Sequence, residues 1–382
     1  YYKGRFIHPL NLATKNMSNK LIKRFFILLL STGLCALGGV FFAVQWMQTP
    51  VPLSAKTTQA TQTTQVTEVS SAPAPIFEIN RGESTAQIAN RLAAAGHLQW
   101  PLIWRAYAHW VENKPIQAGE YQLPARVTPL GILHQLQRGE VIKYTVTFPE
   151  GITYNEFLEI LKQQPKLRHE LSNKPIEEHK KLLQFSYETL DGWFFPDTYS
   201  YLAGDSDKTI LVQAHKKMQQ TIERAWRSRA ENLPYMSAGE ALVMASIIEK
   251  ETGDAREREK IAGVFVRRLK AKMRLQTDPS VIYGLGEAYS GNLTQKDLQT
   301  PGPYNTYLNE GLPPGPIANP GEKAIYAALH PAEGDELYFV AKGDGSHVFS
   351  AHLNEHNKAV EHYQRTNRTE HYRSSPQNKN TP

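Results

Sequence analysis

The pattern of hydrophobic and polar positions divides the chain into an apolar run, a polar stretch and two regions of mixed periodicity. Residues 25–44 form a run of 20 residues that contains no charge. At 1.5 Å per residue, a helix of this length spans about 30 Å, the thickness of a bilayer core. Residues 1–24 hold six Lys and Arg and no acid, whereas residues 45–76 hold one Lys and one Glu. The pattern therefore predicts a single transmembrane helix at 25–45, with the basic segment 1–24 in the cytoplasm.

A cleaved signal peptide is the alternative interpretation of this run. The run exceeds the roughly 7–15 residues of a signal-peptide core, and no good small-residue cleavage site follows it. A lipoprotein signal at Cys35 is disfavoured because the bulky Leu34 precedes it. We therefore expect an uncleaved anchor with Trp46 at the membrane interface. Met17 opens a normal anchor beginning, so we expect residues 1–16 to be an upstream extension.

Two stretches have the composition of disordered chain. Residues 46–76 are dominated by Thr, Gln, Ser, Ala and Pro and hold almost no large apolar residues. Such a segment buries too little surface to fold, so we expect a disordered tether that holds the exported part away from the membrane. Residues 365–382 predict a disordered tail.

Periodic patterns begin again at Phe77 and predict a small β-α-α-β module over residues 77–142. The predicted elements are a strand at 77–79, a helix that starts at the capping box of Ser84 and Gln87 and ends at Gly96, a helix over 101–111, a strand over 118–123 and a helix over 128–138. The module resembles a LysM-like fold, which binds glycans containing N-acetylglucosamine. The alternative role of its tryptophans, Trp100, Trp104 and Trp110, is core packing, which we expect for at least two of them.

Charge and cysteine content narrow the function classes. The formal net charge is +6, but residues 1–24 carry +6 and residues 365–382 carry +3, so the residues between them sum to −3. The folded part is therefore slightly acidic, and its charge balance does not indicate a basic nucleic-acid-binding face. Cys35 is the only cysteine, which excludes an internal disulfide and a cysteine zinc site.

The larger region, residues 143–364, predicts a mixed α+β domain, which makes the fold class α+β, and it holds the candidate catalytic group. A helix that starts with a capping box at Ser237 ends near Glu251. Met244, Ile247 and Ile248 share the face of Glu251 at helical spacing. Burial beside this apolar stripe and the negative end of the helix dipole both favour the protonated carboxyl. Glu251 is therefore predicted to serve as a general acid near neutral pH.

Two alternatives stay open for this pair of glutamates. Glu251 could be an exposed residue of the last turn, paired with Arg256 or Arg258. Glu249 lies roughly 160° away around the helix and is the alternative catalytic acid.

Two irregular segments supply candidate binding residues. Residues 274–286 and 300–321 are dense in Pro, Gly, Asn and Tyr and lack helical or strand periodicity, which is typical of ordered binding loops. Their neutral hydrogen-bonding groups and aromatic faces suit a sugar better than a phosphate. The candidates for binding sugar or orienting Glu251 are Gln276, Thr277, Asp278, Tyr304, Asn305, Thr306 and Tyr307, and the alternative is a purely loop-stabilising role.

Trp193 and Asp197 are weaker candidates for lining the same cleft, because their neighbours have the pattern of a core. The sequence contains no phosphate-binding loop, no Ser-His-Asp pattern and no HExxH zinc motif. Its C-terminal histidines are too loosely spaced for a metal site, so we expect neither a metal nor a cofactor.

Several motifs in order resemble the YceG-like family, the endolytic murein transglycosylases. The likeness rests on SIIEKET, RLQTDPSVIYGLG, YNTY and GLPPGPIANPG, followed by HP, YFVAKGDGSHVFS and HNKAV. It begins upstream with AGEYQL, FPEGITYNEFLEIL and DGWFFPDTYSY and covers roughly 280 residues together with the anchor. Departures are confined to the N-terminal extension, the long Thr/Gln tether and the C-terminal tail.

The resemblance implies a reaction and a catalytic residue. The reaction is cleavage of the MurNAc–GlcNAc β-1,4 bond within peptidoglycan strands, leaving a 1,6-anhydroMurNAc end. The catalytic acid would be the second Glu of EKET, which is Glu251. A single carboxyl suffices in this mechanism because the sugar's own C6 hydroxyl attacks the anomeric carbon, whereas ordinary glycosidases use two carboxylates.

The resemblance also implies a location and partners. We expect a single-pass protein of the bacterial inner membrane with a periplasmic catalytic domain, whose partners are glycan strands and cell-wall synthases and which terminates strand elongation. Two competing functions remain: a non-catalytic peptidoglycan-binding scaffold, and an exported glycoside hydrolase that uses Asp278 or Asp197 as a second carboxylate.

Overall fold

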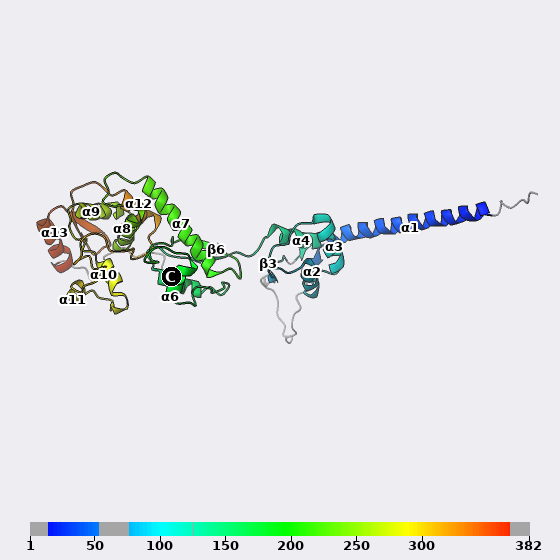
Figure 1. The fold of residues 1–382 in the computed structure, drawn as a ribbon, viewed down its shortest axis with the longest axis horizontal. Coiled ribbons are helices and arrows are strands. Elements are labelled where there is room, and N and C mark those ends of the chain that lie inside the picture. Colours follow the sequence, from blue (N-terminus) through cyan, green and yellow to red (C-terminus); the bar gives the residue numbers. More distant parts are fainter. Residues whose placement is uncertain (1–13, 53–75, 125, 367–382) are drawn as a thin grey trace, which may run out of the picture. The chain divides into compact units, whose positions relative to one another are not determined.

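The computed structural model describes residues 14–52, 76–124 and 126–366 and separates them into two compact units. The division falls between Ile142 and Lys143. Figure 1 labels the helices and strands of both units. Each unit is described by itself below.

The first unit begins with the long helix α1 (Thr14–Gln48). Its part Lys23–Gln48 is long and apolar enough to cross a membrane. The helix starts before the predicted residue 25 and ends three residues after the predicted residue 45. Trp46 and Met47 near its end are buried in the core of the unit, at 8% and 1% exposure. The expectation that Trp46 lies at the membrane interface is therefore wrong, because its ring packs against the globular part.

The globular part of this unit combines short strands with three helices. Strand β2 (Ile76–Ile79) pairs antiparallel with β3 (Gly119–Gln122), and β1 (Val51–Pro52) pairs with β4 (Arg126–Val127). The helices are α2 (Thr85–Ala94), α3 (Pro101–Tyr107), which continues into the π-helical turn η1 (Ala108–Glu112), and α4 (Pro129–Arg138). The order β2-α2-α3-β3 matches the predicted one, and the likeness to LysM stays a prediction.

The local signals that start these helices are present in the structure. The capping box of Ser84 and Gln87 is confirmed, and Gly96 has a φ of 80° just after the helix. The prediction for the tryptophans is wrong, since only Trp104 is buried. Its indole N–H donates to the carbonyl of Pro129 at 2.9 Å, whereas Trp100 and Trp110 face outward.

The predicted tether over 46–76 needs a correction at its start. Residues 46–48 are helical, and Val51 and Pro52 pair with β4. The described residues on both sides of the remaining segment, β1 and β2, belong to the same unit, so α1 passes directly into the globular part. Residues 53–75 lie outside the described residues, as do 1–13 and 367–382 of the predicted extension and tail.

The second unit is a mixed α+β body, as predicted. Two antiparallel pairs, β5 (Tyr144–Thr147) with β6 (Thr198–Tyr201) and β7 (Tyr338–Ala341) with β8 (His347–Ser350), accompany a set of helices. The helices are α5 (Tyr154–Lys162), α6 (Ile176–Leu182), α7 (Asp207–Arg227), α8 (Ala238–Glu251), α9 (Arg258–Lys270), α10 (Asp278–Leu285), the 3-10 turn η2 (Gly286–Ala288), α11 (Gln295–Leu298), α12 (Glu322–Leu329), α13 (Leu353–Val360) and the π-helical turn η3 (Glu361–Thr366).

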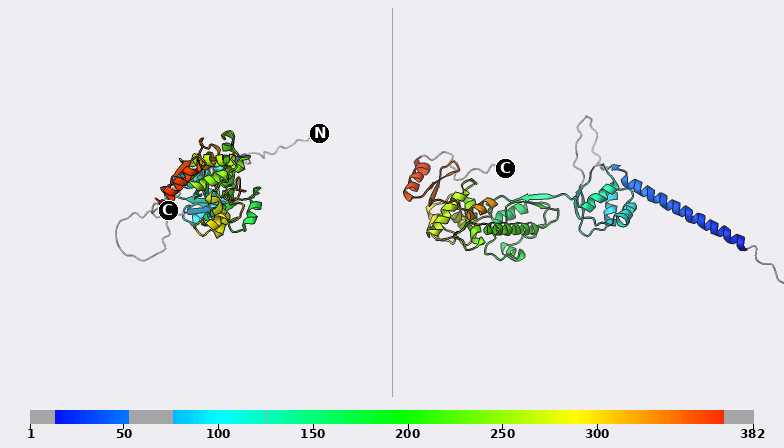
Figure 2. Two further views of the ribbon diagram at one scale, coloured as in Figure 1. Left: turned by 90° about the vertical axis from the view of Figure 1, so that its left-hand side faces the viewer. Right: turned by 90° about the horizontal axis from the view of Figure 1, so that it is seen from above.

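Helix α8 is the centre of this unit. It begins where the Ser237 side chain accepts a hydrogen bond from the backbone N–H of Glu240, and α7, α9, α10 and α12 pack around it. All residues from Ala241 to Ile248 are buried. The helix is thus buried on every side instead of on the single face that the sequence pattern predicted. Figure 2 shows the hairpin β7–β8 and helix α13, in orange to red, lying together at one end of the unit.

Candidate active site

Glu251 is the last residue of α8, and the chain turns extended at Thr252 immediately after it. Its side chain is partly buried and interacts with Thr277, Asp278 and Arg268. Burial raises the pKa of Glu251 to about 7, and the negative charge of Asp278 acts in the same direction. Thr277 and Arg268 act in the opposite direction. The carboxyl is therefore a proton donor near neutral pH that has a cation and a hydroxyl near it.

Thr277 places a buried hydroxyl next to this carboxyl. Its backbone is fixed on both sides: its N–H donates to Oγ1 of Thr306 at 3.0 Å, and its carbonyl accepts from Oγ of Ser280 at 2.9 Å. Its own hydroxyl is buried and has no hydrogen-bond partner of normal geometry among the described residues. Although Thr277 precedes α10, its side chain does not cap that helix. The hydroxyl is left to interact with Glu251, whose pKa it lowers by hydrogen bonding.

Asp278 and Tyr307 form the exposed side of the site. The Tyr307 hydroxyl donates to Oδ1 of Asp278 at 2.6 Å. Burial and this carboxylate both raise the pKa of Tyr307, so the phenol stays protonated. This hydrogen bond joins the start of α10 to the segment 304–307. The two bonded residues are almost thirty positions apart in the sequence.

Arg268 is a member of the site that the sequence prediction missed. Its guanidinium is buried, lies 5.2 Å above the ring of Tyr338 and donates from Nε to the carbonyl of Leu337 at 2.7 Å. Nη1 donates to the carbonyl of Leu275 at 2.9 Å and lies 3.3 Å from Oε1 of Gln276. Arg268 lies seven residues after Ile261 and therefore shares the apolar face of α9. A charged residue on an apolar helix face is a sequence signal that could have identified Arg268 as a site residue.

The remaining predicted loop residues divide into structural and accessible ones. Asn305 is buried. Its side-chain Nδ2 donates hydrogen bonds to the carbonyls of Leu298 and Thr300, at 3.0 and 2.7 Å. Thr306 is buried too and ties the two loops together, because its carbonyl also accepts from the N–H of Gln276 at 3.2 Å. Both side chains are buried and are engaged in contacts within the loops. Gln276 is exposed and adopts a left-handed backbone with φ of 52°.

Tyr304 belongs to a neighbouring cluster of polar aromatic groups. Its ring meets that of Tyr283 edge to face at 4.8 Å, and the Tyr283 hydroxyl donates to Oδ2 of Asp191 at 2.7 Å. Burial raises the pKa of Asp191. A side chain at Gly315 would meet the Tyr304 hydroxyl at 3.1 Å, so the segment 311–316 passes close beside it.

The structure does not bring Trp193 and Asp197 to Glu251. Trp193 lines a cavity of about 930 Å³ at the other end of α8, where Tyr187 stacks on it at 3.5 Å. The 14 residues of α8 place that cavity about 20 Å along the helix from Glu251. Asp197 forms an ion pair with Lys217 and accepts from the N–H of Thr198.

Glu249 forms a buried ion pair. Its Oε1 lies 2.8 Å from Nη2 of Arg258, and its Oε2 accepts from the N–H of Gly321 at 2.9 Å. Arg256, the other cation considered for Glu251, pairs with Asp254 at 2.7 Å. The structure therefore gives Glu249 a structural role and leaves Glu251 without an ion-pair partner among the described residues.

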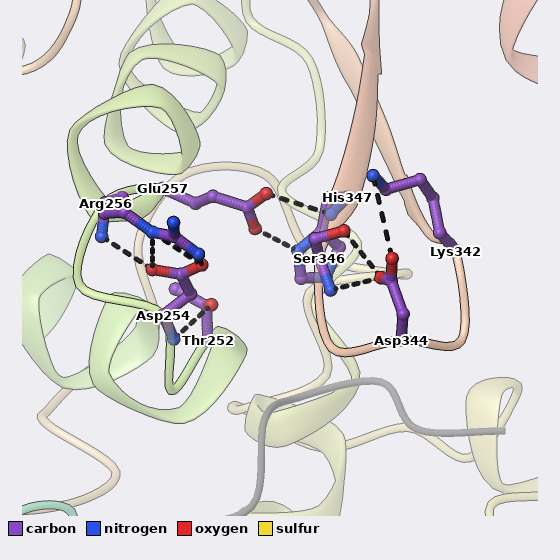
Figure 3. Close-up of polar contacts among 8 residues, drawn as sticks. All are labelled: Thr252, Asp254, Arg256, Glu257, Lys342, Asp344, Ser346 and His347. Atoms are coloured by element: carbon purple, nitrogen blue, oxygen red, sulfur yellow. Dashed lines mark hydrogen bonds and ion pairs between the residues drawn. The ribbon is translucent and has the colours of Figure 1, made fainter. Parts of the chain in front are cut away.

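The turn that follows Glu251 is fixed to the hairpin β7–β8, as Figure 3 shows. Oγ1 of Thr252 accepts from the N–H of Asp254 at 3.0 Å. Farther along, Glu257 accepts from the N–H of His347 at 3.0 Å and pairs with its Nδ1 at 2.8 Å. These contacts hold the C-terminal end of α8 in place. Within the described ranges, no group of three or more His, Cys, Asp or Glu could hold a metal ion.

Comparison with known proteins places these residues in a family. The family model described as the YceG-like family matches residues 77–362. A protein of Bacillus subtilis named endolytic murein transglycosylase is 31% identical over 344 residues, which cover 86% of this chain and 91% of that protein. A protein of Streptococcus pneumoniae with the same name is 27% identical over 310 residues, or 72% of this chain and 56% of that protein. The crystal structure of a YceG-like protein from Listeria monocytogenes is 33% identical and covers 74% of this chain and 98% of that one, with a TM-score of 0.48.

Proposed function

The chain belongs to the YceG-like family and is an enzyme of the lytic murein transglycosylase class, and we propose that it cleaves the MurNAc–GlcNAc β-1,4 bond within glycan strands with Glu251 as its single acid and base. The product would be a strand that ends in 1,6-anhydroMurNAc. The observation that carries the proposal is the carboxyl of Glu251, whose pKa burial raises to about 7 and which has no ion-pair partner among the described residues.

The proposed reaction has two proton transfers through one carboxyl. Protonated Glu251 first donates to the leaving glycosidic oxygen as the bond to the anomeric carbon breaks. The resulting carboxylate then accepts the proton of the C6 hydroxyl, whose oxygen attacks the same carbon. The carboxyl is regenerated, and no water and no second carboxylate take part. Hydrolases of the usual kind need a second carboxylate as nucleophile or base.

The groups around Glu251 suit both halves of this reaction. Arg268 and Thr277 lower the pKa of Glu251, so they stabilise the carboxylate that exists between the two transfers. Burial and Asp278 favour the protonated form at the start. Preorganised charges of this kind stabilise an intermediate without reorganisation during the reaction.

We assign the accessible polar groups to substrate binding. Gln276, Asp278 and Tyr307 border the carboxyl and would hydrogen-bond the sugars on either side of the cleaved bond. Trp193, with Tyr187 stacked on it, offers an aromatic wall for a more distant part of the strand. The segment 304–316 connects the two places, since Tyr307 contacts Asp278 and residues 311–316 line the cavity of Trp193.

The helix α1 is consistent with a membrane anchor. We propose a single-pass protein of the inner membrane with its N-terminus in the cytoplasm and the catalytic unit in the periplasm. At this location the enzyme would cut nascent strands beside the cell-wall synthases and terminate their elongation.

Digestion of purified sacculi with the full chain in detergent micelles tests the reaction. Fragments with anhydro ends are expected, whereas new reducing ends would indicate a hydrolase and no release would indicate a binding scaffold. Glu251→Gln should abolish release. Glu259→Gln is the matched control, because Glu259 is an exposed glutamate in the first turn of α9. Release by Glu251→Gln at the wild-type rate would exclude the assignment.

A further inference from the structure

Helix α3 and its continuation η1 carry a second apolar surface that points away from the core of the first unit. Trp104 faces the core and is fully buried, whereas Leu102, Trp110 and Val111 are 72%, 81% and 62% exposed. Trp100, the residue before the helix, is 47% exposed. We call these four exposed residues the α3 face. Large exposed apolar side chains grouped in one element mark an interaction surface.

The α3 face lies beside the end of the membrane-spanning helix. The ring of Trp100 meets that of Phe42 in α1 edge to face, with centroids 6.0 Å apart. Trp46 and Met47, which follow in α1, are buried in the same core as Trp104. The globular part of the unit is therefore packed directly against the last turns of α1.

The position of Phe42 fixes the depth of this contact in a membrane. The uncharged run of α1 covers residues 25–44 and matches the roughly 30 Å of a bilayer core. Phe42 is two residues, or about 3 Å, from the end of that run. Trp100 beside it therefore lies at the level where hydrocarbon gives way to headgroups. Tryptophan is enriched at this level because its ring is apolar and its N–H is polar.

The charges on the same helix also suit a lipid surface. Arg105, three residues after Leu102, is exposed, and Lys114 just after η1 has 67% of its side chain exposed. The acidic residue between them, Glu112, is only 20% exposed and contacts His134 and Lys114. Basic residues interspersed with Trp and Leu are the composition of segments that lie in the membrane interface.

We propose that the α3 face is a membrane-docking surface, and that Trp100, Leu102 and Trp110 lie in the headgroup region of the same bilayer that α1 crosses. The inference rests on α1 as a membrane anchor and not on the reaction at Glu251. The first unit is then held against the membrane at two places. The α3 face, and not Trp46, then anchors the unit in the membrane interface.

A depth measurement on the full chain in lipid nanodiscs tests the proposal. The chain is reconstituted in phosphatidylcholine and phosphatidylglycerol in a Cys35→Ser background, which leaves no native cysteine. Trp110→Cys carries an environment-sensitive fluorophore, and Leu102→Cys provides a second, independent site on the face. Asn90→Cys is the control, because Asn90 is an exposed polar residue of the neighbouring helix α2. All three positions are exposed, so the substitutions should leave the fold unchanged.

We expect lipids with a nitroxide near the headgroup to quench the fluorescence of labels at positions 110 and 102 several-fold more than that of a label at position 90. Aqueous iodide should quench the labels at 110 and 102 less than the label at 90. Circular dichroism checks that each labelled variant is folded. Equal access of iodide to all three positions would overturn the proposal. It would also be overturned if positions 110 and 102 became protected only on addition of N-acetylglucosamine oligosaccharides, since the face would then be a sugar-binding surface.

Discussion

Replacing Glu251 with glutamine should make the protein more stable above pH 7 while it removes the catalytic acid. The reason is the pKa of Glu251, which burial raises from its ordinary value of 4.5 to about 7. A carboxyl with a raised folded-state pKa opposes folding once it ionises. The wild type therefore loses stability as the pH rises from about 4.5 to about 7. The glutamine variant has no proton to lose at this position and keeps that stability.

The size of the effect follows from the difference between the two pKa values. At about 1.4 kcal/mol per pKa unit, the shift from 4.5 to about 7 corresponds to about 3 kcal/mol in the free energy of unfolding. The variant should gain about this amount at pH 8 and only a few tenths of a kcal/mol at pH 4. For a unit of this size, 3 kcal/mol corresponds to a rise in melting temperature of about 6–12 °C.

Calorimetry of the wild type and the variant across pH 4–8 provides the measurement. The two melting curves are compared at each pH, so the contributions of other titrating groups cancel. Placing an amide beside Arg268 adds a pH-independent term that shifts the whole difference curve and leaves its slope unchanged. A difference that does not grow between pH 4.5 and 7 would refute the pKa assignment. Glu259→Gln serves again as the control and should show no such growth.

Four further substitutions separate the groups around this carboxyl, each measured by release of anhydro-ended fragments over a pH series together with the melting temperature. Asp278→Asn removes a negative charge that raises the pKa of Glu251, so the upper limb of the pH–rate profile should move down by up to about one pH unit. Arg268→Met should move that limb up and slow the reaction about 10–100-fold, because the carboxylate loses its nearby cation. Thr277→Val should slow the reaction about 10–100-fold, because the Glu251 carboxylate loses this hydrogen bond, and the melting temperature should stay unchanged at acidic pH, where Glu251 is protonated. Glu249→Gln should lower the stability by about 3 kcal/mol, because the buried Arg258 loses its buried anionic partner and keeps only the more exposed Glu150 at 3.7 Å. A limb that moves the same way in Asp278→Asn and Arg268→Met would contradict the proposed electrostatics.

Local signals in the sequence predicted the parts of the fold that depend on neighbouring residues. The Ser237 cap marks the start of α8, and the capping box of Ser84 and Gln87 marks the start of α2, because side chains three residues apart satisfy the first N–H groups of a helix. The apolar run of α1 was evident from its length and lack of charge. These features require no knowledge of tertiary contacts.

Features that depend on tertiary packing were predicted less well. Helical periodicity places Glu249 away from the apolar stripe of Glu251, but α7, α9, α10 and α12 pack around α8 and Glu249 is buried with Arg258. In the same way, the aromatic pattern around α3 does not reveal that Trp104 faces the core while Trp110 faces outward. Which side of a helix is covered depends on partners far away in sequence, so periodicity alone cannot assign it.

The candidate site can nevertheless be recognised by how its hydrogen bonds are distributed. Buried polar groups in folded proteins almost always have partners, and an exception requires an explanation. Here Thr306 joins the two loops on either side of the site, and the backbone of Thr277 is held at both its N–H and its carbonyl. The hydroxyl of Thr277 is among the buried polar groups without a partner of normal geometry, and it lies next to a carboxyl that has no ion-pair partner among the described residues. The loops beside Glu251 are fixed by hydrogen bonds, while the Thr277 hydroxyl stays available to the carboxyl, which is the arrangement that a preorganised catalytic carboxyl requires.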